Sequence, residues 1–105
     1  MEHHPALGSL DPDEEIHVQT RAGDMTVIVT DRRLAVAAAE RLALDVHIEN
    51  LRRIQFDIER DRPATLVVVP QSPQDEPQVI AVQPDDYEGV AEALVVVGRR
   101  LAAAS

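Results

Sequence analysis

Apolar residues recur at every second position in several short runs of this 105-residue chain, and this spacing constrains the fold more than any other feature. In the run 42–48 the apolar positions are Leu42, Leu44, Val46 and Ile48. On an α-helix these side chains would be divided between two opposite faces, whereas on a strand they share one face. Residues 42–48 are therefore predicted to form a strand, although the Ala, Leu, Arg and Glu residues just before them favour a helix.

The residues upstream follow the same pattern. MTVIVT, residues 25–30, alternates and is rich in β-branched side chains, which favour a pleated surface. TDRR, residues 30–33, predicts a turn in which Asp31 can accept hydrogen bonds from nearby backbone N–H groups. A further strand begins at Leu34, so AAAER, residues 37–41, must form a tight connection to the next one.

Alternation continues as far as residue 82. Ile48, Leu51 and Ile54 are three residues apart, which predicts one helical turn, and alternation then predicts a strand from Ile54 through Phe56 to Ile58. Further strands are predicted at IHVQT (16–20), TLVVV (65–69) and QVIAV (78–82), with a proline-containing loop at 70–77. About seven short strands at hairpin-like spacing indicate a mainly β fold, an antiparallel sandwich or barrel.

The C-terminal segment has a different period. Pro84 suits a first helical position, Asp85 and Asp86 suit a first turn, and Arg99 and Arg100 suit a last turn. Spacings of three and four residues connect one apolar stripe, formed by Tyr87, Val90, Leu94, Val97 and Leu101. The sequence therefore predicts one amphipathic C-terminal helix, whose stripe covers the open end of the strands.

Length and composition limit the organisation. A chain of 105 residues suffices for one core, so we predict a disordered acidic lead-in at 1–13 and a single domain at 14–105. The absence of cysteine excludes disulfides, a thiol nucleophile and a cysteine zinc site. The acidic start lacks a signal peptide and the longest apolar runs are too short to span a membrane, so a soluble, cytoplasmic protein is expected.

Charge limits the partners. The net charge is −9, with 19 acidic and 10 basic residues, and such a field repels phosphate backbones and anionic lipid surfaces. Phe56 and Tyr87 are the only aromatic residues, which leaves almost no platform for base stacking. We therefore expect neither nucleic acid nor a membrane as the partner.

Two stretches carry a family resemblance. EEIHVQTRAGDMTVIVTDRRLAV, residues 14–36, resembles the start of bacterial PH-like and GRAM-type domains, in which a T(D/N)RRL hairpin follows the second strand. DVHIENLRRIQF, residues 45–56, is similar to the strand–turn–strand passage of those families. The resemblance covers about residues 14–103. It implies a pleckstrin-homology-like superfold, a PH-like barrel or sandwich of about seven antiparallel strands capped by one amphipathic α-helix.

The resemblance also bears on ligands. PH domains that bind phosphoinositides carry a cluster of Lys and Arg in and beside the loop joining the first two strands. The matching segment here, TRAGDM, offers Arg21 next to Asp24, so phosphoinositide is not expected as a ligand. The Trp that eukaryotic PH domains carry in the C-terminal helix is absent, which makes a bacterial relative the closer analogy.

No pattern in the sequence predicts catalysis, a cofactor or a metal. The serines lie outside any nucleophile motif, and the histidines lack metal-ligand spacing: Ser9, Ser72 and Ser105; His3, His4, His17 and His47. Asp85 and Asp86 are better explained by the helix start than by acid–base chemistry. Arg32 and Arg33 could bind an anion, but arginines in a hairpin turn are more often solvated. No catalytic, cofactor-binding or metal-binding residue is assigned, and a non-enzymatic role is expected.

Four apolar residues are candidates for a partner interface: Val95, Val96, Ala103 and Ile28. Val96 is predicted on the solvent side of the helix with Ala103 one heptad further on, Val95 lies at its flank, and Ile28 falls on the threonine face of its strand. The leading hypothesis is a non-enzymatic PH-like interaction module of a bacterial cytoplasm that binds protein, including itself as a homo-oligomer. The alternative is a GRAM-like lipid- or membrane-associated adaptor.

Overall fold

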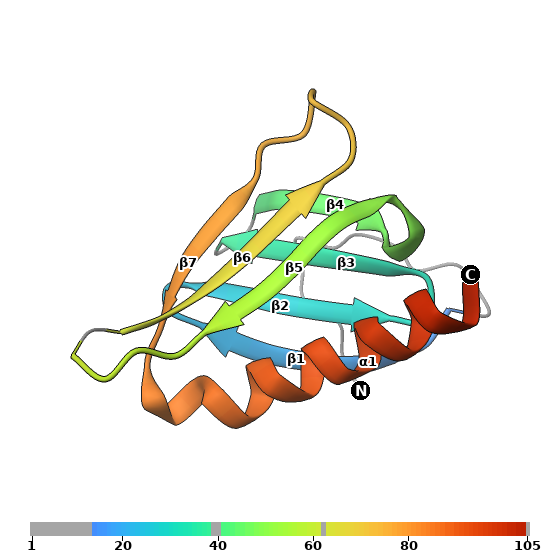
Figure 1. The fold of residues 1–105 in the computed structure, drawn as a ribbon. Coiled ribbons are helices and arrows are strands. Elements are labelled where there is room, and N and C mark those ends of the chain that lie inside the picture. The colour runs from blue at the N-terminus through green and yellow to red at the C-terminus, as the bar shows by residue number, and fades with distance from the viewer. Residues whose placement is uncertain (1–13, 39–40, 62, 105) are drawn as a thin grey trace.

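The structure is a computed structural model that describes residues 14–38, 41–61 and 63–104. Over these residues it is mainly β, with two antiparallel sheets and one C-terminal α-helix (Figure 1). The elements are β1 (Ile16–Ala22), β2 (Met25–Thr30), β3 (Arg33–Ala38), β4 (Arg41–His47), η2 (Ile48–Asn50), β5 (Leu51–Asp57), β6 (Ala64–Pro70), β7 (Gln78–Val82), η3 (Pro84–Asp86) and α1 (Tyr87–Ala104), where η denotes a 3₁₀ helix. The predicted strands and the C-terminal helix are confirmed.

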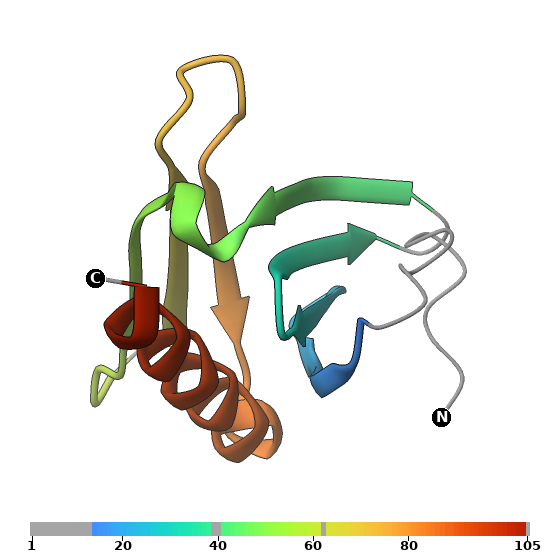
Figure 2. The ribbon, with the colours of Figure 1, turned by 90° about the vertical axis from the view of Figure 1, so that its right-hand side faces the viewer.

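The strands follow chain order within each sheet. One sheet has the order β1-β2-β3-β4 and the other the order β5-β6-β7, and every pair is antiparallel. The second sheet runs obliquely across the first, and α1 lies across one open end of the two layers (Figure 2). The two sheets remain separate within the described residues, so the closed barrel among our expectations is not seen.

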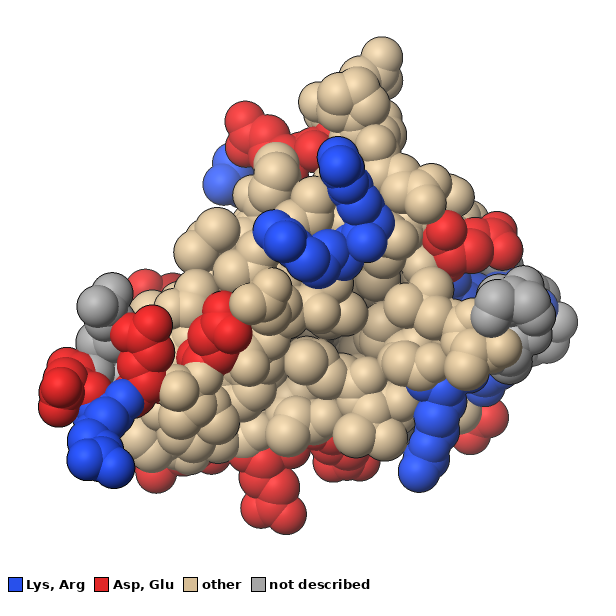
Figure 3. All heavy atoms as spheres, viewed as in Figure 1, with Lys and Arg blue, Asp and Glu red and all other residues tan. Residues whose placement is uncertain are grey.

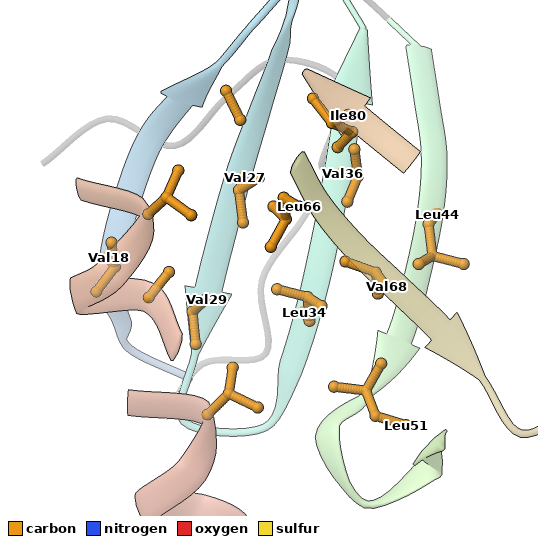
Figure 4. Packing of buried hydrophobic residues seen from close by; sticks show 14 of the residues in the cluster. Val18, Val27, Val29, Leu34, Val36, Leu44, Leu51, Leu66, Val68 and Ile80 are labelled. Atoms are coloured by element: carbon orange, nitrogen blue, oxygen red, sulfur yellow. The ribbon is translucent and has the colours of Figure 1, made fainter. Parts of the chain in front are cut away.

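The core fills the space between the two sheets and the helix. Its largest fully buried side chains come from all three layers, and they include Val27, Leu34, Leu66, Val90 and Val97. Figure 4 shows the strand members of this cluster pointing toward one another between β1–β4 and β6–β7. These are the alternate apolar positions that the strand periodicity selects.

A bulge in β4 corrects one prediction. The ladder shifts between Val36, paired with Leu44, and Ala37, paired with Leu42, so Ala43 is the extra residue. A bulge reverses the faces that follow it, because two residues on one strand oppose a single one on the other. Leu44 therefore lies in the core, whereas Leu42 turns to the outer face of the first sheet. The prediction that Leu42 shares a face with Leu44 was wrong.

A second bulge acts in the same way at β1. Ile16 pairs with Thr30 and Val18 pairs with Val29, which makes His17 the extra residue. Val18 enters the core, and Ile16 turns outward to the same face as Leu42. The result is a second apolar cluster on the outside of the first sheet, called the outer cluster here, formed by Ile16, Ile28, Ala35 and Leu42.

The corner between the sheets combines a helical turn with a third bulge. The predicted helical turn is confirmed as η2, which ends at Asn50. The three-residue spacing from Leu51 to Ile54 comes instead from a bulge in β5. Leu51 pairs with Pro70 and Arg53 with Val69, so Arg52 is an extra strand residue. Ile58, expected within the strand, lies beyond its end and is exposed.

The helix differs from its prediction at both ends. Pro84, Asp85 and Asp86 form η3, and α1 begins only at Tyr87. Because α1 continues to Ala104, Arg99 and Arg100 do not lie in its last turn. The apolar stripe is confirmed, with Val90 and Val97 buried and the other three members half-buried, and Ala93 joins it as a further buried residue.

The described residues do not include the expected lead-in at 1–13 or residues 39–40 in the middle of the AAAER connection. The turn at 30–33 is confirmed, because β2 ends at Thr30 and β3 begins at Arg33. The helices in the described part of the chain are all too short or too polar to cross a membrane.

Candidate interaction surfaces

Strand β6 is apolar on both of its faces. Leu66 and Val68 point into the core and are buried, while Val67 and Val69 alternate with them on the outer face of the second sheet. Val79 of β7 pairs with Val67 and is 70% exposed. Val67, Val69 and Val79 form what we call the valine face.

The margins of the valine face are polar. Arg53 and Gln55 of β5 pair with Val69 and Val67, and both are exposed. Figure 3 shows an uncharged surface over β7, two basic side chains that extend across the face from the β5 side, and acidic side chains toward its edges. An antiparallel sheet with one face in water usually carries polar residues on that face. A strand that is apolar on both faces is therefore unusual where one face is uncovered.

The outer face of the first sheet contains fully buried residues, unlike the valine face. Ile28 and Ala35 are completely buried there, at 0% exposure, with Ile16 and Leu42 packed beside them. The expectation that Ile28 is accessible to a partner was therefore wrong. Its alternation with the inward-facing Val27 and Val29 places it on the outer face correctly, but alternation does not report whether that face is covered.

Helix α1 places the other three candidates differently from one another. Val95 is 51% exposed, on the outward side with Glu92 and Arg99. Val96 is half-buried and packs against the core, so the prediction that water bathes it was wrong. The buried arc of the helix is centred near Ala93 rather than Leu94, which turns Val96 toward β1. Ala103 lies within α1, and its side chain is outside the described set.

A polar network holds the β2–β3 turn. Thr30 is fully buried; its Oγ1 accepts hydrogen bonds from the backbone N–H groups of Arg32 (3.1 Å) and Arg33 (3.0 Å). The same hydroxyl donates to Glu14 Oε2 at 2.6 Å. Asp31, which we expected to accept from nearby N–H groups, instead accepts from the backbone N–H of Glu15 at 3.1 Å. Thr30 therefore has the role predicted for Asp31.

The same network binds Arg33. Its guanidinium donates to Glu14 through Nε (2.8 Å) and Nη2 (2.9 Å) and to Asp45 through Nη1 (3.1 Å). The Glu14 side chain is only 1% exposed. The hydrogen bond to Glu14 raises the pKa of Arg33, and the charge of Asp45 adds to this against the opposing effect of burial. Arg33 is thus a structural ion-pair partner rather than the solvated turn residue we expected.

A groove of about 620 Å³ lies between the β1–β2 turn and β7. One wall is formed by Arg21, Gly23, Asp24 and Met25. The other is formed by Gln78 to Ala81, with Asp85 and Asp86 at its end. Arg21 is its single basic residue against the carboxylates of Asp24, Asp85 and Asp86. Gly23, at φ +61°, brings the turn close to β7, since a Cβ at this position would overlap the Ala81 carbonyl oxygen.

The described serine and histidine side chains that could serve catalysis or metal binding do not all come together in one site. His17 Nε2 lies 3.1 Å from Arg100 Nη2, and His47 and Ser72 are exposed beside another surface hollow. Within the described part of the chain, no three His, Asp or Glu side chains are placed to hold a metal ion. His3, His4, Ser9 and Ser105 lie outside that part.

Comparison with known proteins does not assign a function to these surfaces. No family model, curated protein or solved structure matches the chain. The case for a function therefore comes from the chemistry of the valine face and of the groove beside β7.

Proposed function

We propose that this chain is a non-enzymatic PH-like interaction module that binds protein, in particular a second copy of itself, through the valine face. The succession of a four-stranded antiparallel sheet, a three-stranded antiparallel sheet and a C-terminal helix supports the PH-like assignment. A bacterial cytoplasm is the setting that we propose for it.

The observation that carries the proposal is the two-sided apolar character of β6. Strands that are continuously apolar are typical of sheets covered on both faces. The inner face of β6 meets the core, whereas Val67 and Val69 remain only half-buried and the neighbouring Val79 is 70% exposed. A second molecule on this face would remove these three side chains from water, and each buried methylene contributes about 0.8 kcal/mol.

The charge distribution makes the valine face a better contact between two copies than the rest of the surface. A chain of net charge −9 repels its own kind, so two copies associate most easily where acidic side chains are absent. The valine face has no carboxylate among its members, and Arg53 at its margin can meet acidic groups of the partner copy. Self-association through an uncharged face with an arginine at its margin is therefore compatible with the net negative charge of the chain.

The test is the solution mass of the chain, measured by light scattering over a dilution series. We expect a concentration-dependent dimer in the wild type and a monomer in the double variant Val67→Thr, Val69→Thr. Threonine keeps the β-branched shape and the strand preference, so the thermal midpoint should hardly change. Val79 is left intact here because it also lines the groove beside β7.

Val95→Thr is the matched control, since it makes the same change on the exposed side of α1. It should leave the dimer intact. A dimer that survives Val67→Thr, Val69→Thr but dissociates with Val95→Thr would move the interface to the helix. A wild type that is monomeric at every concentration would contradict self-association altogether.

The competing hypothesis of a GRAM-like lipid adaptor has less support. The groove beside the β1–β2 turn offers one arginine, Arg21, and three carboxylates to an anionic head group. We expect no flotation of the protein with anionic phospholipid vesicles at physiological salt. Flotation under these conditions would favour the adaptor over the protein-binding module.

A further inference from the structure

In the part of the chain that the structure describes, one edge of β7 has no neighbouring strand. Strand β7 is the last strand in the order β5-β6-β7, and within the described residues its ladder partner is β6 alone. The Ala81 carbonyl oxygen is turned toward Gly23 of the β1–β2 turn, away from β6. Because alternate residues of a strand direct their N–H and C=O groups to the same side, those of Val79 also point to this open edge.

The groove follows this edge. Gln78, Val79, Ile80 and Ala81 line one wall, so the free edge of β7 borders a hollow of about 620 Å³. Ligand sites in proteins span about 300–1,000 Å³. An unpaired strand edge is a template for a further strand, with main-chain hydrogen bonds supplying affinity.

The charges around the groove indicate which strand would fit. Asp24 lies in the β1–β2 turn, Asp85 and Asp86 lie in η3, and Arg21 balances only one of the three carboxylates. The net charge of −9 extends this negative potential beyond the groove. A strand with Lys or Arg side chains would be attracted to this site, and an acidic strand would be repelled.

We infer that this groove binds an extended, basic peptide segment of a partner protein, which adds as a strand to the free edge of β7. The segment's backbone would pair with Val79, and its cationic side chains would lie among Asp24, Asp85 and Asp86. The inference goes beyond the proposed function, because it concerns the edge of β7 rather than the outer face of the sheet, with Val79 bordering both, and a partner of opposite charge. A second copy of the chain fits this groove poorly, since it would bring its own excess of carboxylates to it.

The probe is a fluorescein-labelled heptapeptide in which valine and arginine alternate, and binding is followed by fluorescence anisotropy at low salt. We expect saturable binding of this peptide and no binding of the matched valine–glutamate peptide. Absence of binding by the arginine peptide, or equal binding of both peptides, would overturn the inference.

Charge is tested with the triple variant Asp24→Asn, Asp85→Asn, Asp86→Asn. It should weaken binding of the arginine peptide by about tenfold, since exposed ion pairs each contribute a modest amount. The matched control is Glu49→Gln, Glu88→Gln, Glu92→Gln, which removes the same total charge from exposed positions outside the groove. The control should weaken binding much less. Equal losses in the two variants would show a general charge effect and overturn the site.

Strand addition is tested on both partners. Val79→Pro removes the N–H group that faces the open edge and spares the ladder with β6, so it should abolish binding while the circular dichroism spectrum is kept. If this variant does not fold, a peptide N-methylated at alternate residues makes the test from the other side, and it should bind at least about tenfold more weakly. Two such peptides are needed, one methylated at the odd residues and one at the even residues, because only one set of N–H groups faces β7. Undiminished binding of both peptides would overturn strand addition.

Light scattering separates this inference from the proposed function. Peptide binding should persist in Val67→Thr, Val69→Thr, which leaves the groove untouched. Because Val79 also belongs to the valine face, Val79→Thr, which changes the side chain and keeps the N–H group, is the control. Dissociation of a wild-type dimer by folded Val79→Pro but not by Val79→Thr, without any peptide binding in the wild type, would mean that a second copy occupies the edge. That outcome would overturn the assignment to a basic peptide.

Discussion

Thr30, Glu14 and Arg33 show how single side chains secure the connection between β2 and β3. The buried Thr30 hydroxyl accepts two backbone N–H groups of the turn and donates to Glu14, whose carboxylate also receives two hydrogen bonds from Arg33. Each buried polar group therefore has a partner, as a buried carboxylate requires. The pairing also fixes Glu14 against a residue 19 positions later in the chain.

This ion pair leads to a prediction at the residue scale. Arg33→Met should lower the free energy of unfolding by about 2–4 kcal/mol, because it removes the ion pair and the two hydrogen bonds that Arg33 makes with the buried Glu14 carboxylate. The double variant Glu14→Gln, Arg33→Met should lose less than the single variant, because the buried side chain at position 14 is then neutral and Asp45, the other partner of Arg33, is partly exposed to water. Urea denaturation of the two variants measures both values. A single variant as stable as the wild type would contradict a structural role for the pair.

The sign of the pH effect follows from the raised pKa of Arg33. A group whose pKa is raised in the folded state contributes fully below its unfolded pKa, and its contribution is lost as the pH rises through the folded value. Arginine titrates far above neutrality, so the contribution of Arg33 should be constant from neutral to moderately alkaline pH.

At the scale of elements, α1 is positioned by a close approach to β1. A Cβ at Gly89 would lie 2.0 Å from Thr20 Oγ1 and 2.8 Å from Thr20 Cβ, so the helix and the strand are separated by less than an alanine needs. Val96 and Arg100 continue the same side of the helix, and Arg100 reaches His17 in the β1 bulge at 3.1 Å. Val96 lies between Gly89 and Arg100 on this side of α1, which explains why it is turned away from solvent.

Two glycines in this one helix give a matched prediction. Gly89→Ala should lower the free energy of unfolding by about 1–3 kcal/mol, because Thr20 or the helix backbone must move. Gly98→Ala should raise it by about 0.5–1 kcal/mol, because its Cβ would meet nothing within 4 Å and alanine favours a helix. Thermal and urea denaturation measure both variants. A stabilising Gly89→Ala would contradict the close packing of α1 on β1.

At the scale of the whole molecule, charge and apolar surface are separated. Acidic groups surround the β7 groove, whereas the valine face is uncharged, and the chain as a whole carries −9. Self-association must therefore overcome long-range repulsion, while a basic peptide gains from the same field. The two proposed interactions respond to screening in opposite directions.

Ionic strength is thus a test of the whole charge distribution. Raising salt from about 0.01 M to about 0.15 M shortens the Debye length from about 30 Å to about 8 Å. Light scattering should then show stronger self-association, and anisotropy should show weaker binding of the arginine peptide. If both interactions weaken with salt, the valine face is not the surface through which two copies meet.

The order and type of the elements were determined by the sequence alone. Strand and helix periods depend on side chains a few residues apart, so the seven strands, the turn at 30–33 and the stripe on α1 could all be predicted. The same local information placed Ile28 on the face opposite Val27 and located the proline-containing loop before β7, although Pro70, predicted in that loop, is the last residue of β6.

The faces that meet, and those that remain uncovered, were decided only by the tertiary structure. Bulges at His17, Ala43 and Arg52 depend on the register of the partner strand, and they moved Ile16 and Leu42 to the outer cluster. The valine face could have been suspected from the continuous apolar run in β6, but whether such a run is covered depends on distant parts of the chain. The groove beside β7 joins residues about 60 positions apart, and no local spacing encodes such a contact.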